Sequence, residues 1–145
     1  MYRDKSNQSG DVSALTARLD MAKKGFIVSE PLSRDSVYDF LVETPDGIES
    51  VQVKTMCGNS ITKVVNRSGE RVSANGKIRN SIDYAQHGID WLVGVHKDGR
   101  VFYYRHENYS NIPSDSFSVN KYPSDEFPLY EVPNRHTKPL LKDIA

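Results

Sequence analysis

The N-terminal part of the chain repeats apolar residues every three or four positions. This spacing predicts a helix over residues 11–24 whose buried stripe consists of Val12, Leu15, Leu19 and Ala22. Ser9 is a suitable N-cap for this helix, and Gly25 after two lysines is a typical helix end. We therefore expect a first helix that covers a sheet.

Farther along, apolar and polar residues alternate as they do in strands. The pattern predicts short strands at 26–28, 36–43 and 48–56. Between the last two lies Thr44-Pro45-Asp46-Gly47, whose residue types are those of a tight turn. We expect these two strands to form an antiparallel hairpin.

The second half of the chain predicts further short elements. We expect a hairpin over 61–73 that turns at 67–69 and a short helix from about Ser81 to Gly88. A last strand pair is expected at 90–96 and 100–105, around the turn Lys97-Asp98-Gly99. These elements predict an α/β (α+β) core with a mixed central sheet flanked by helices.

The expected organisation is one core domain at 1–106, which includes an inserted segment at 58–82, followed by an arm at 107–145. The arm carries prolines at intervals with Tyr and Phe between them, a composition typical of an extended segment. We expect this arm to pack on the core or on a partner subunit.

Composition narrows the class of protein. The 145 residues are 37% hydrophobic and 26% charged, with 19 basic and 19 acidic residues, as in globular proteins outside membranes. A single cysteine and the absence of an apolar N-terminal run favour a reducing, cytoplasmic (intracellular) location. The neutral total conceals a basic stretch, because only Glu70 offsets the five basic residues between Gly58 and Ile82.

The third predicted strand carries the candidate chemistry. Gln52 and Lys54 share one face of this strand, because side chains alternate. If the hairpin loop has two or four residues, Asp39 lies directly across from Gln52, whereas a three-residue loop places it opposite Val53. A sheet with one wet face explains the same pattern without any active site.

In the first register these residues suit phosphodiester hydrolysis. Asp39 is an anionic ligand for an oxygen-bound metal, and the Gln52 side-chain carbonyl or the Val53 backbone carbonyl can complete the shell. Lys54 beside them can steady an attacking water and the charge that builds on the phosphate.

The stretch from Gly10 to Thr55 resembles the PD-(D/E)XK, restriction-endonuclease-like superfamily of nucleases. The matching features are a glycine-led helix, Gly25-Phe26 opening the first strand, Tyr38-Asp39, and Val51-Gln52-Val53-Lys54-Thr55. The Gln-x-Lys form is most similar to small phage and intron-associated homing endonucleases. The resemblance implies a metal-binding role for Asp39, a second metal position at Gln52, a catalytic role for Lys54, and Mg²⁺ or Mn²⁺ as cofactor.

Two residues depart from the family pattern. Gln52 replaces an anion with a neutral ligand, and Ala14 occupies a first-helix position where related nucleases often carry glutamate. Either Asp11 or another carboxylate takes over, or the missing acid leaves a protein that binds DNA and barely cuts it. The change at position 14 is natural or engineered.

The resemblance implies a sequence-specific endonuclease acting on double-stranded DNA. One such site cuts one strand, so a double-strand cut implies a homodimer or homotetramer. The alternatives are a nuclease similar to Holliday junction resolvases and a DNA-binding protein without cleavage activity. Candidate DNA contacts are basic side chains: Arg34, Lys63, Arg67, Arg71, Lys77 and Arg79.

Overall fold

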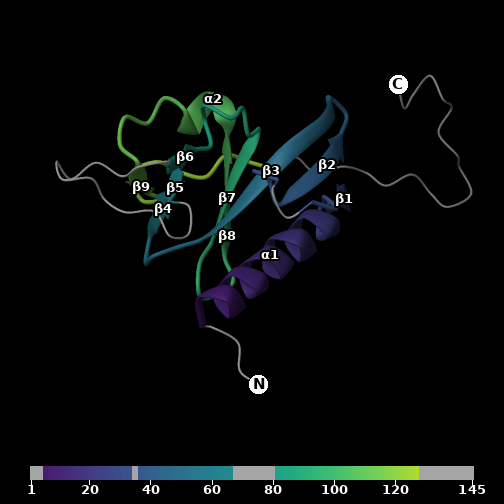
Figure 1. Cartoon of the computed structure of the whole chain (residues 1–145), viewed down its shortest axis with the longest axis horizontal. Helices are drawn as coiled ribbons and strands as arrows, with labels where there is room; N and C mark the ends of the chain where they lie inside the picture. Colours follow the sequence, from purple (N-terminus) through teal and green to yellow (C-terminus); the bar gives the residue numbers. More distant parts are fainter. Residues whose placement is uncertain (1–4, 34–35, 67–80, 128–145) are drawn as a thin grey trace, which may run out of the picture.

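The computed structural model describes residues 5–33, 36–66 and 81–127 of the chain and is built on a five-stranded sheet. Its strand order is β1-β2-β3-β7-β8 (Figure 1). The strands are β1 (Ile27–Ser29), β2 (Phe40–Thr44), β3 (Gly47–Thr55), β7 (Trp91–Val95) and β8 (Val101–Arg105). Neighbouring strands are antiparallel except β3 and β7, which are parallel. The predicted mixed sheet is therefore confirmed.

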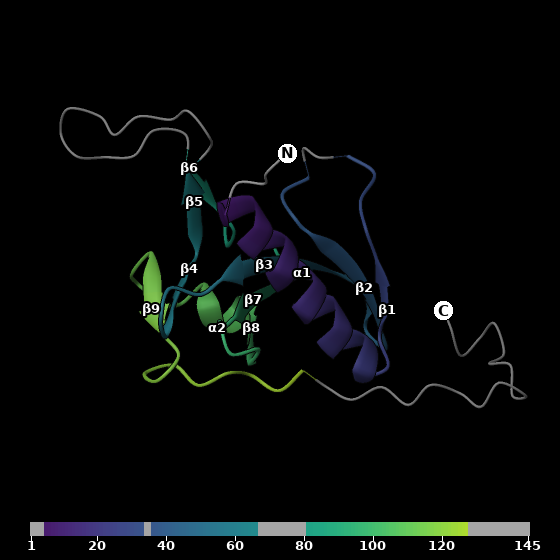
Figure 2. The same cartoon turned by 90° about the horizontal axis from the view of Figure 1, so that it is seen from below.

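Different elements cover the two faces of the sheet. Helix α1 (Lys5–Lys23) lies across one face and contacts β1, β3, β7 and β8 (Figure 2). The parallel pair needs a long crossover, and residues 56–90 provide it. The crossover and the chain after β8 form β4 (Ser60–Thr62), β5 (Val64–Asn66), β6 (Ser81–Asp83), α2 (His106–Tyr109) and β9 (Ser116–Ser118).

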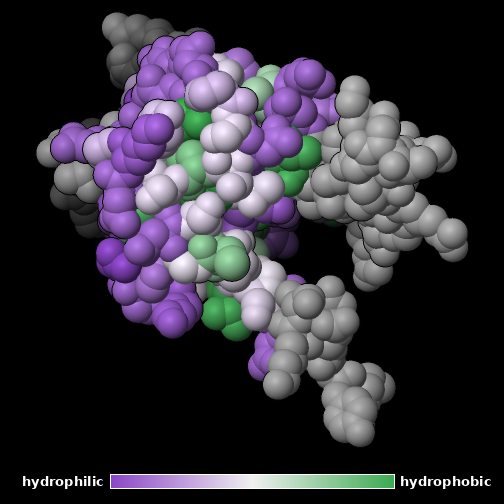
Figure 3. Space-filling view, turned by 90° about the vertical axis from the view of Figure 1, so that its left-hand side faces the viewer, coloured by the Kyte–Doolittle hydropathy of each residue, from purple (hydrophilic) through white to green (hydrophobic). Residues whose placement is uncertain are grey.

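Each face has its own hydrophobic cluster. The α1-side cluster consists of Ala17, Met21, Phe26, Phe40, Val42, Val51, Val53, Trp91, Val93, Val95, Tyr103 and Phe127. The far-side cluster consists of Met56, Ile61, Tyr84, Ile89, Leu92, Tyr104, Tyr109, Ile112, Phe117 and Val119. Strand β7 is buried along its whole length because it contributes to both clusters. Seen from the β4 and β9 side, the surface is mostly hydrophilic with scattered apolar residues (Figure 3).

The face of α1 that packs on the sheet differs from the predicted one. Val12, Leu15 and Leu19 are 55%, 65% and 57% exposed, whereas Ala17 and Met21 are fully buried. Val12, Leu15 and Leu19 thus lie on the exposed side of α1, and Ala17 and Met21 make the contact with the sheet. The predicted N-cap is also wrong, because Ser9 lies inside a helix that begins at Lys5.

The strands near the site follow the predictions closely. The expected strands at 48–56, 90–96 and 100–105 appear with their ends shifted by one residue. The strand expected at 36–43 begins only at Phe40. The pairing with β3 ends at Phe40 and Val51, so the residues before Phe40 are not part of the strand. The predicted antiparallel hairpin of β2 and β3 and the predicted last strand pair, β7 and β8, are confirmed.

The crossover differs from the prediction. Strand β5 pairs with β6, with Val65 opposite Ile82, so the partner of residues 64–66 is the segment 81–83 and not the expected second arm of a hairpin over 61–73. The expected turn at 67–69 lies outside the described residues. Residues 81–83 form a strand where a helix was expected, and the chain then turns until Gly88, whose φ is +68°.

The expected C-terminal arm is described as far as Phe127, and this part packs on the core. Tyr109 and Phe117 join the far-side cluster, and Phe127 joins the α1-side cluster. Contact of the arm with a partner subunit stays a prediction. Within the described part of the chain, no helix is long and apolar enough to cross a membrane.

Candidate functional site

The β2–β3 hairpin sets the register of the site. Thr44 pairs with Gly47, so the connection is the two residues Pro45 and Asp46. The Thr44 hydroxyl accepts a hydrogen bond from the Asp46 N–H at 3.1 Å and donates to the Gly47 carbonyl at 3.0 Å. Because Phe40 pairs with Val51, Asp39 lies across from Gln52, as the two-residue loop predicts.

Asp39 occupies the point where β2 and β3 stop pairing. Its backbone N–H donates to the Val51 carbonyl at 2.8 Å, and its Oδ2 accepts from the Val53 N–H at 2.8 Å. The carboxylate thus replaces a strand partner for β3. Burial raises the pKa of Asp39, and the Val53 N–H and the charge of Lys54 partly oppose this rise.

Gln52 and Lys54 point to the far side of the sheet. They lie opposite Leu92 and Gly94 of the parallel strand β7. The Gln52 Nε2 donates to the Val53 carbonyl at 3.2 Å. Burial lowers the pKa of Lys54, and the negative charge of Asp39 partly opposes this shift. The two ionisable groups therefore lie within each other's electrostatic field.

Glycine at position 94 provides space opposite Lys54. A Cβ there would lie 2.7 Å from Cγ1 of Ile61 and 3.1 Å from Cγ of Met56. The far-side cluster thus packs directly against the β7 backbone at this level.

The donor atoms around Val53 fit a divalent cation that prefers oxygen. The N–H and C=O of a strand residue face the same neighbour, so the Val53 carbonyl lies on the Asp39 side. The Asp39 carboxylate, this carbonyl and the Gln52 Oε1 are ligand types that Mg²⁺ and Mn²⁺ accept. Only Asp39 brings a negative charge, and within the described ranges no three His, Cys, Asp or Glu residues gather as a metal site.

Ala14 lies near the C-terminal end of β3, but it packs against the α1-side cluster, on the face of the sheet opposite to Gln52 and Lys54. The neighbouring Ser13 places its hydroxyl 2.7 Å from that of Thr55, the residue after Lys54. Ala14 itself is half-buried against the α1-side cluster. Position 14 therefore supplies no carboxylate to the site.

One predicted DNA contact is wrong. Lys63 is only 6% exposed, and its ammonium group donates to the carbonyl oxygens of Ile112 and, at 3.4 Å, Tyr109. A lysine held in this way cannot reach a phosphate. The other predicted contacts, Arg34, Arg67, Arg71, Lys77 and Arg79, lie outside the described residues.

Sequence reasoning missed Tyr84, whose ring lies 5.6 Å from the Lys54 Nζ. No local pattern links Tyr84 to Lys54, which lies thirty positions earlier in the chain. Asp90 is also held in place by β3, because its Oδ2 accepts from the Ser50 N–H at 2.8 Å and from the Ser50 hydroxyl at 3.2 Å. The only local signal for Asp90 is its position directly before the buried strand β7.

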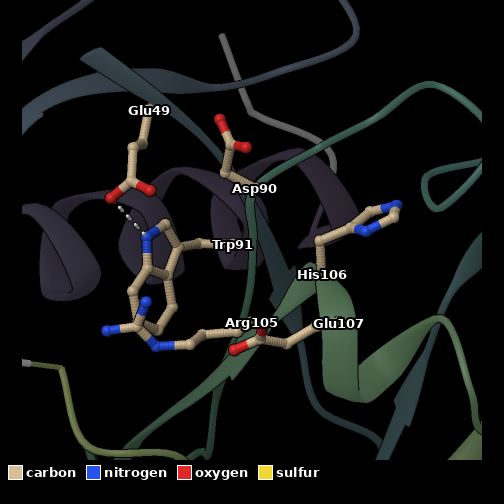
Figure 4. A pocket seen from close by; sticks show the side chains of 6 residues that line it. All are labelled: Glu49, Asp90, Trp91, Arg105, His106 and Glu107. Atoms are coloured by element: carbon tan, nitrogen blue, oxygen red, sulfur yellow. Dashed lines mark hydrogen bonds between the residues drawn. The ribbon is translucent and has the colours of Figure 1, made fainter. Parts of the chain in front are cut away.

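A polar pocket of about 210 Å³ lies at the start of β3 and β7, the ends opposite to Lys54 (Figure 4). The Trp91 Nε1 donates to Glu49 at 3.2 Å, and the Arg105 guanidinium stacks 4.6 Å from the Trp91 ring. The Nε2 of His106 lies 2.9 Å from the Ala85 carbonyl. Because these polar groups bond to protein partners, we do not include this pocket in the candidate site.

Asp39, Gln52 and Lys54 thus lie together at a mixed sheet whose other face is covered by α1. The chain matches the PD-(D/E)XK endonuclease family over residues 4–125 and therefore belongs to this family. Among solved structures it is similar to a bacterial homing endonuclease, I-Ssp6803I, with a TM-score of 0.60 and 19% identity. That similarity covers 94% of this chain and 85% of the other and shows a shared fold. A comparison with curated proteins found no match.

Proposed function

We propose that this protein is a sequence-specific endonuclease that hydrolyses phosphodiester bonds of double-stranded DNA with the help of Mg²⁺ or Mn²⁺. The observation that carries the proposal is the Asp39 carboxylate, which lies 2.8 Å from the Val53 N–H, across from Gln52 and within the field of Lys54. Membership of the endonuclease family and the fold shared with a homing endonuclease support it.

Asp39, Gln52 and the Val53 carbonyl would hold the metal ion in this function. When bound, the ion supplies charge neutralisation at the phosphate and a more acidic water. Asp39 provides the only negative charge among these ligands, so its pKa must lie below the working pH. In this function the Lys54 ammonium would donate a hydrogen bond to a phosphate oxygen and offset the charge that develops there.

Asp39→Asn and Lys54→Met test these roles. Each change should lower the rate of Mg²⁺-dependent nicking of a plasmid library by about a hundredfold or more, because each removes a charge used in the transition state. Asp98→Asn is a matched control, since Asp98 is an exposed turn residue that bonds to Arg100. Retained nicking in the Asp39 and Lys54 variants would contradict the proposal.

The ligand set carries only one negative charge, and this favours an alternative function in which the protein binds DNA but cuts it slowly. Ala14→Glu adds a carboxylate on the helix segment that reaches the end of β3 through Ser13 and Thr55. We expect it to raise Mg²⁺-dependent nicking by about tenfold or more, because a second anion strengthens metal binding. Ala14→Gln has the same size without the charge and should give no gain; an equal response of both variants would refute the role of an acid at position 14.

We further propose that the active species is a homodimer or homotetramer, because one site hydrolyses one strand at a time. A four-way junction offered beside linear duplex distinguishes a junction resolvase. Preference for the linear duplex is expected, in line with the homing endonuclease whose fold the chain shares.

A further inference from the structure

Tyr84 is mounted rigidly beside the candidate site. It follows β6 directly and is only 3% exposed within the far-side cluster. Its backbone N–H donates to the Lys63 carbonyl at 3.2 Å, and its carbonyl accepts from the Ile89 N–H at 3.1 Å. Lys63 is itself anchored through its ammonium group to Tyr109 and Ile112. The backbone that carries the Tyr84 ring is therefore held from both sides.

The face of this ring meets the ammonium group of Lys54. The Nζ lies 5.6 Å from the ring centroid, within the range of a cation–π interaction. Lys54 is half-buried, and such an attraction is stronger where water is partly excluded. The ring thus offsets part of the cost of keeping Lys54 charged.

The same tyrosine lies within the field of Asp39. Burial raises the pKa of Tyr84, and the negative charge of Asp39 is the second cause. The hydroxyl therefore keeps its proton at any working pH, and the ring remains neutral and electron-rich beside Lys54. Both charged members of the candidate site act on Tyr84.

We propose that Tyr84 is a positioning residue for Lys54, whose aromatic face holds the ammonium group on the side of the sheet where Asp39 and Gln52 lie. This inference rests on the proposed function, because it assigns Lys54 a role at the phosphate. It requires an aromatic ring at position 84 and does not require the hydroxyl. If Tyr84 served only to fill the core, leucine could replace it without an effect on Lys54.

Nuclear magnetic resonance of protein labelled with ¹³C at lysine Cε tests the contact without any cleavage assay. The Lys54 signal is the one that disappears in Lys54→Arg. A proton above an aromatic face experiences the ring current, so the Lys54 Hε signals should be shifted upfield in the wild type and in Tyr84→Phe. In Tyr84→Leu the upfield shift should vanish, because the aromatic ring that causes it is gone.

Cleavage kinetics test the consequence. Tyr84→Phe should keep kcat within about threefold, whereas Tyr84→Leu should lower kcat by about tenfold or more with unchanged DNA affinity, because Lys54 loses its orientation. Tyr122→Leu is a matched control, since Tyr122 also packs against the far-side cluster and lies beside a different lysine, Lys121, at 5.5 Å. This control should leave the Lys54 signals and kcat unchanged.

The outcomes separate the two proposals. An unshifted Lys54 signal in the wild type overturns the positioning role, even if Tyr84→Leu does not fold. Equal Lys54 signals or equal kcat values in Tyr84→Phe and Tyr84→Leu overturn it as well. Ring-dependent Lys54 signals in a protein that cuts no DNA with Mg²⁺ or Mn²⁺ would instead refute the proposed function and keep the contact.

Discussion

At the scale of single residues, Asp39 and Lys54 carry charges in surroundings that disfavour them. Burial is the larger cause of both pKa shifts, and the attraction between the two groups is the smaller one. The folded protein therefore holds the Asp39 proton more tightly than the unfolded chain does, and it releases the Lys54 proton more readily. Both shifts mean that the charged pair lowers the stability of the fold near neutral pH.

The pH range of this effect follows from the direction of each shift. The pKa of Asp39 is raised from 3.8 in the folded protein, so proton binding to Asp39 stabilises the fold. This stabilisation is complete below pH 3.8 and is lost as the pH rises through the higher pKa of the folded state. The pKa of Lys54 is lowered from 10.5, so the neutral form of Lys54 stabilises the fold. This stabilisation is complete above pH 10.5 and is lost as the pH falls through the lower pKa of the folded state. At neutral pH both contributions are absent.

Asp39→Asn should therefore raise the Tm at pH 7 by about 2–4 °C, on the order of 1 kcal/mol for a domain of this size. Asparagine still offers an oxygen to the Val53 N–H, so the backbone contact is kept. Melting curves in EDTA should show the gain at pH 7 and a smaller gain as the pH approaches 4. A lower Tm than the wild type at pH 7 would show that the attraction to Lys54 outweighs burial.

At the scale of elements, α1 shows how packing overrides an apolar pattern. The predicted stripe points outward, and the buried side of the helix consists of small or slender residues, Ser13, Ala17 and Met21. The hydroxyl of Ser13 is buried because it has a partner in Thr55. Periodicity alone ranks Leu15 above Ser13 as a core residue, and only the contact with β3 reverses this order.

Two identical substitutions on α1 test this orientation. Ala17→Leu places a larger side chain against the sheet and should destabilise the protein by roughly 1–3 kcal/mol. Ala22→Leu makes the same change on the exposed side of the helix and should stay within about 0.5 kcal/mol of the wild type. Urea unfolding measures both; the reverse order would restore the predicted stripe as the buried face.

At the scale of the whole molecule, the chain after β8 closes the core. The Asp125 N–H donates to the Tyr103 carbonyl at 2.7 Å, and the Asp125 Oδ2 accepts from the Arg105 N–H at 2.8 Å, so this segment covers the free edge of β8. It then delivers Phe127 to the α1-side cluster. The Phe127 ring lies 4.5 Å from Phe26 and 4.6 Å from Trp91 and Tyr103.

Phe127→Ala should therefore cost about 3–5 kcal/mol, because it empties a site between aromatic rings that belong to three separate segments. Leu32→Ala is the control, since Leu32 is fully exposed and its truncation should change stability by less than about 0.5 kcal/mol. Chemical denaturation of the full chain measures both values. A small effect at Phe127 would mean that the segment only rests on the core.

The sequence by itself determined the part of the protein that depends on local rules. The turn residues Thr44–Gly47 predict the hairpin, and the alternation along β3 places Gln52 and Lys54 on one face. The structure then fixed the loop at two residues, which brings Asp39 across from Gln52. Tertiary structure alone decided which side of α1 is buried, that Lys63 is a buried anchor, and that Tyr84 lies over Lys54. Strand periodicity and turn geometry act over a few residues, whereas these three features arise from contacts between segments far apart in the chain, which no local pattern encodes.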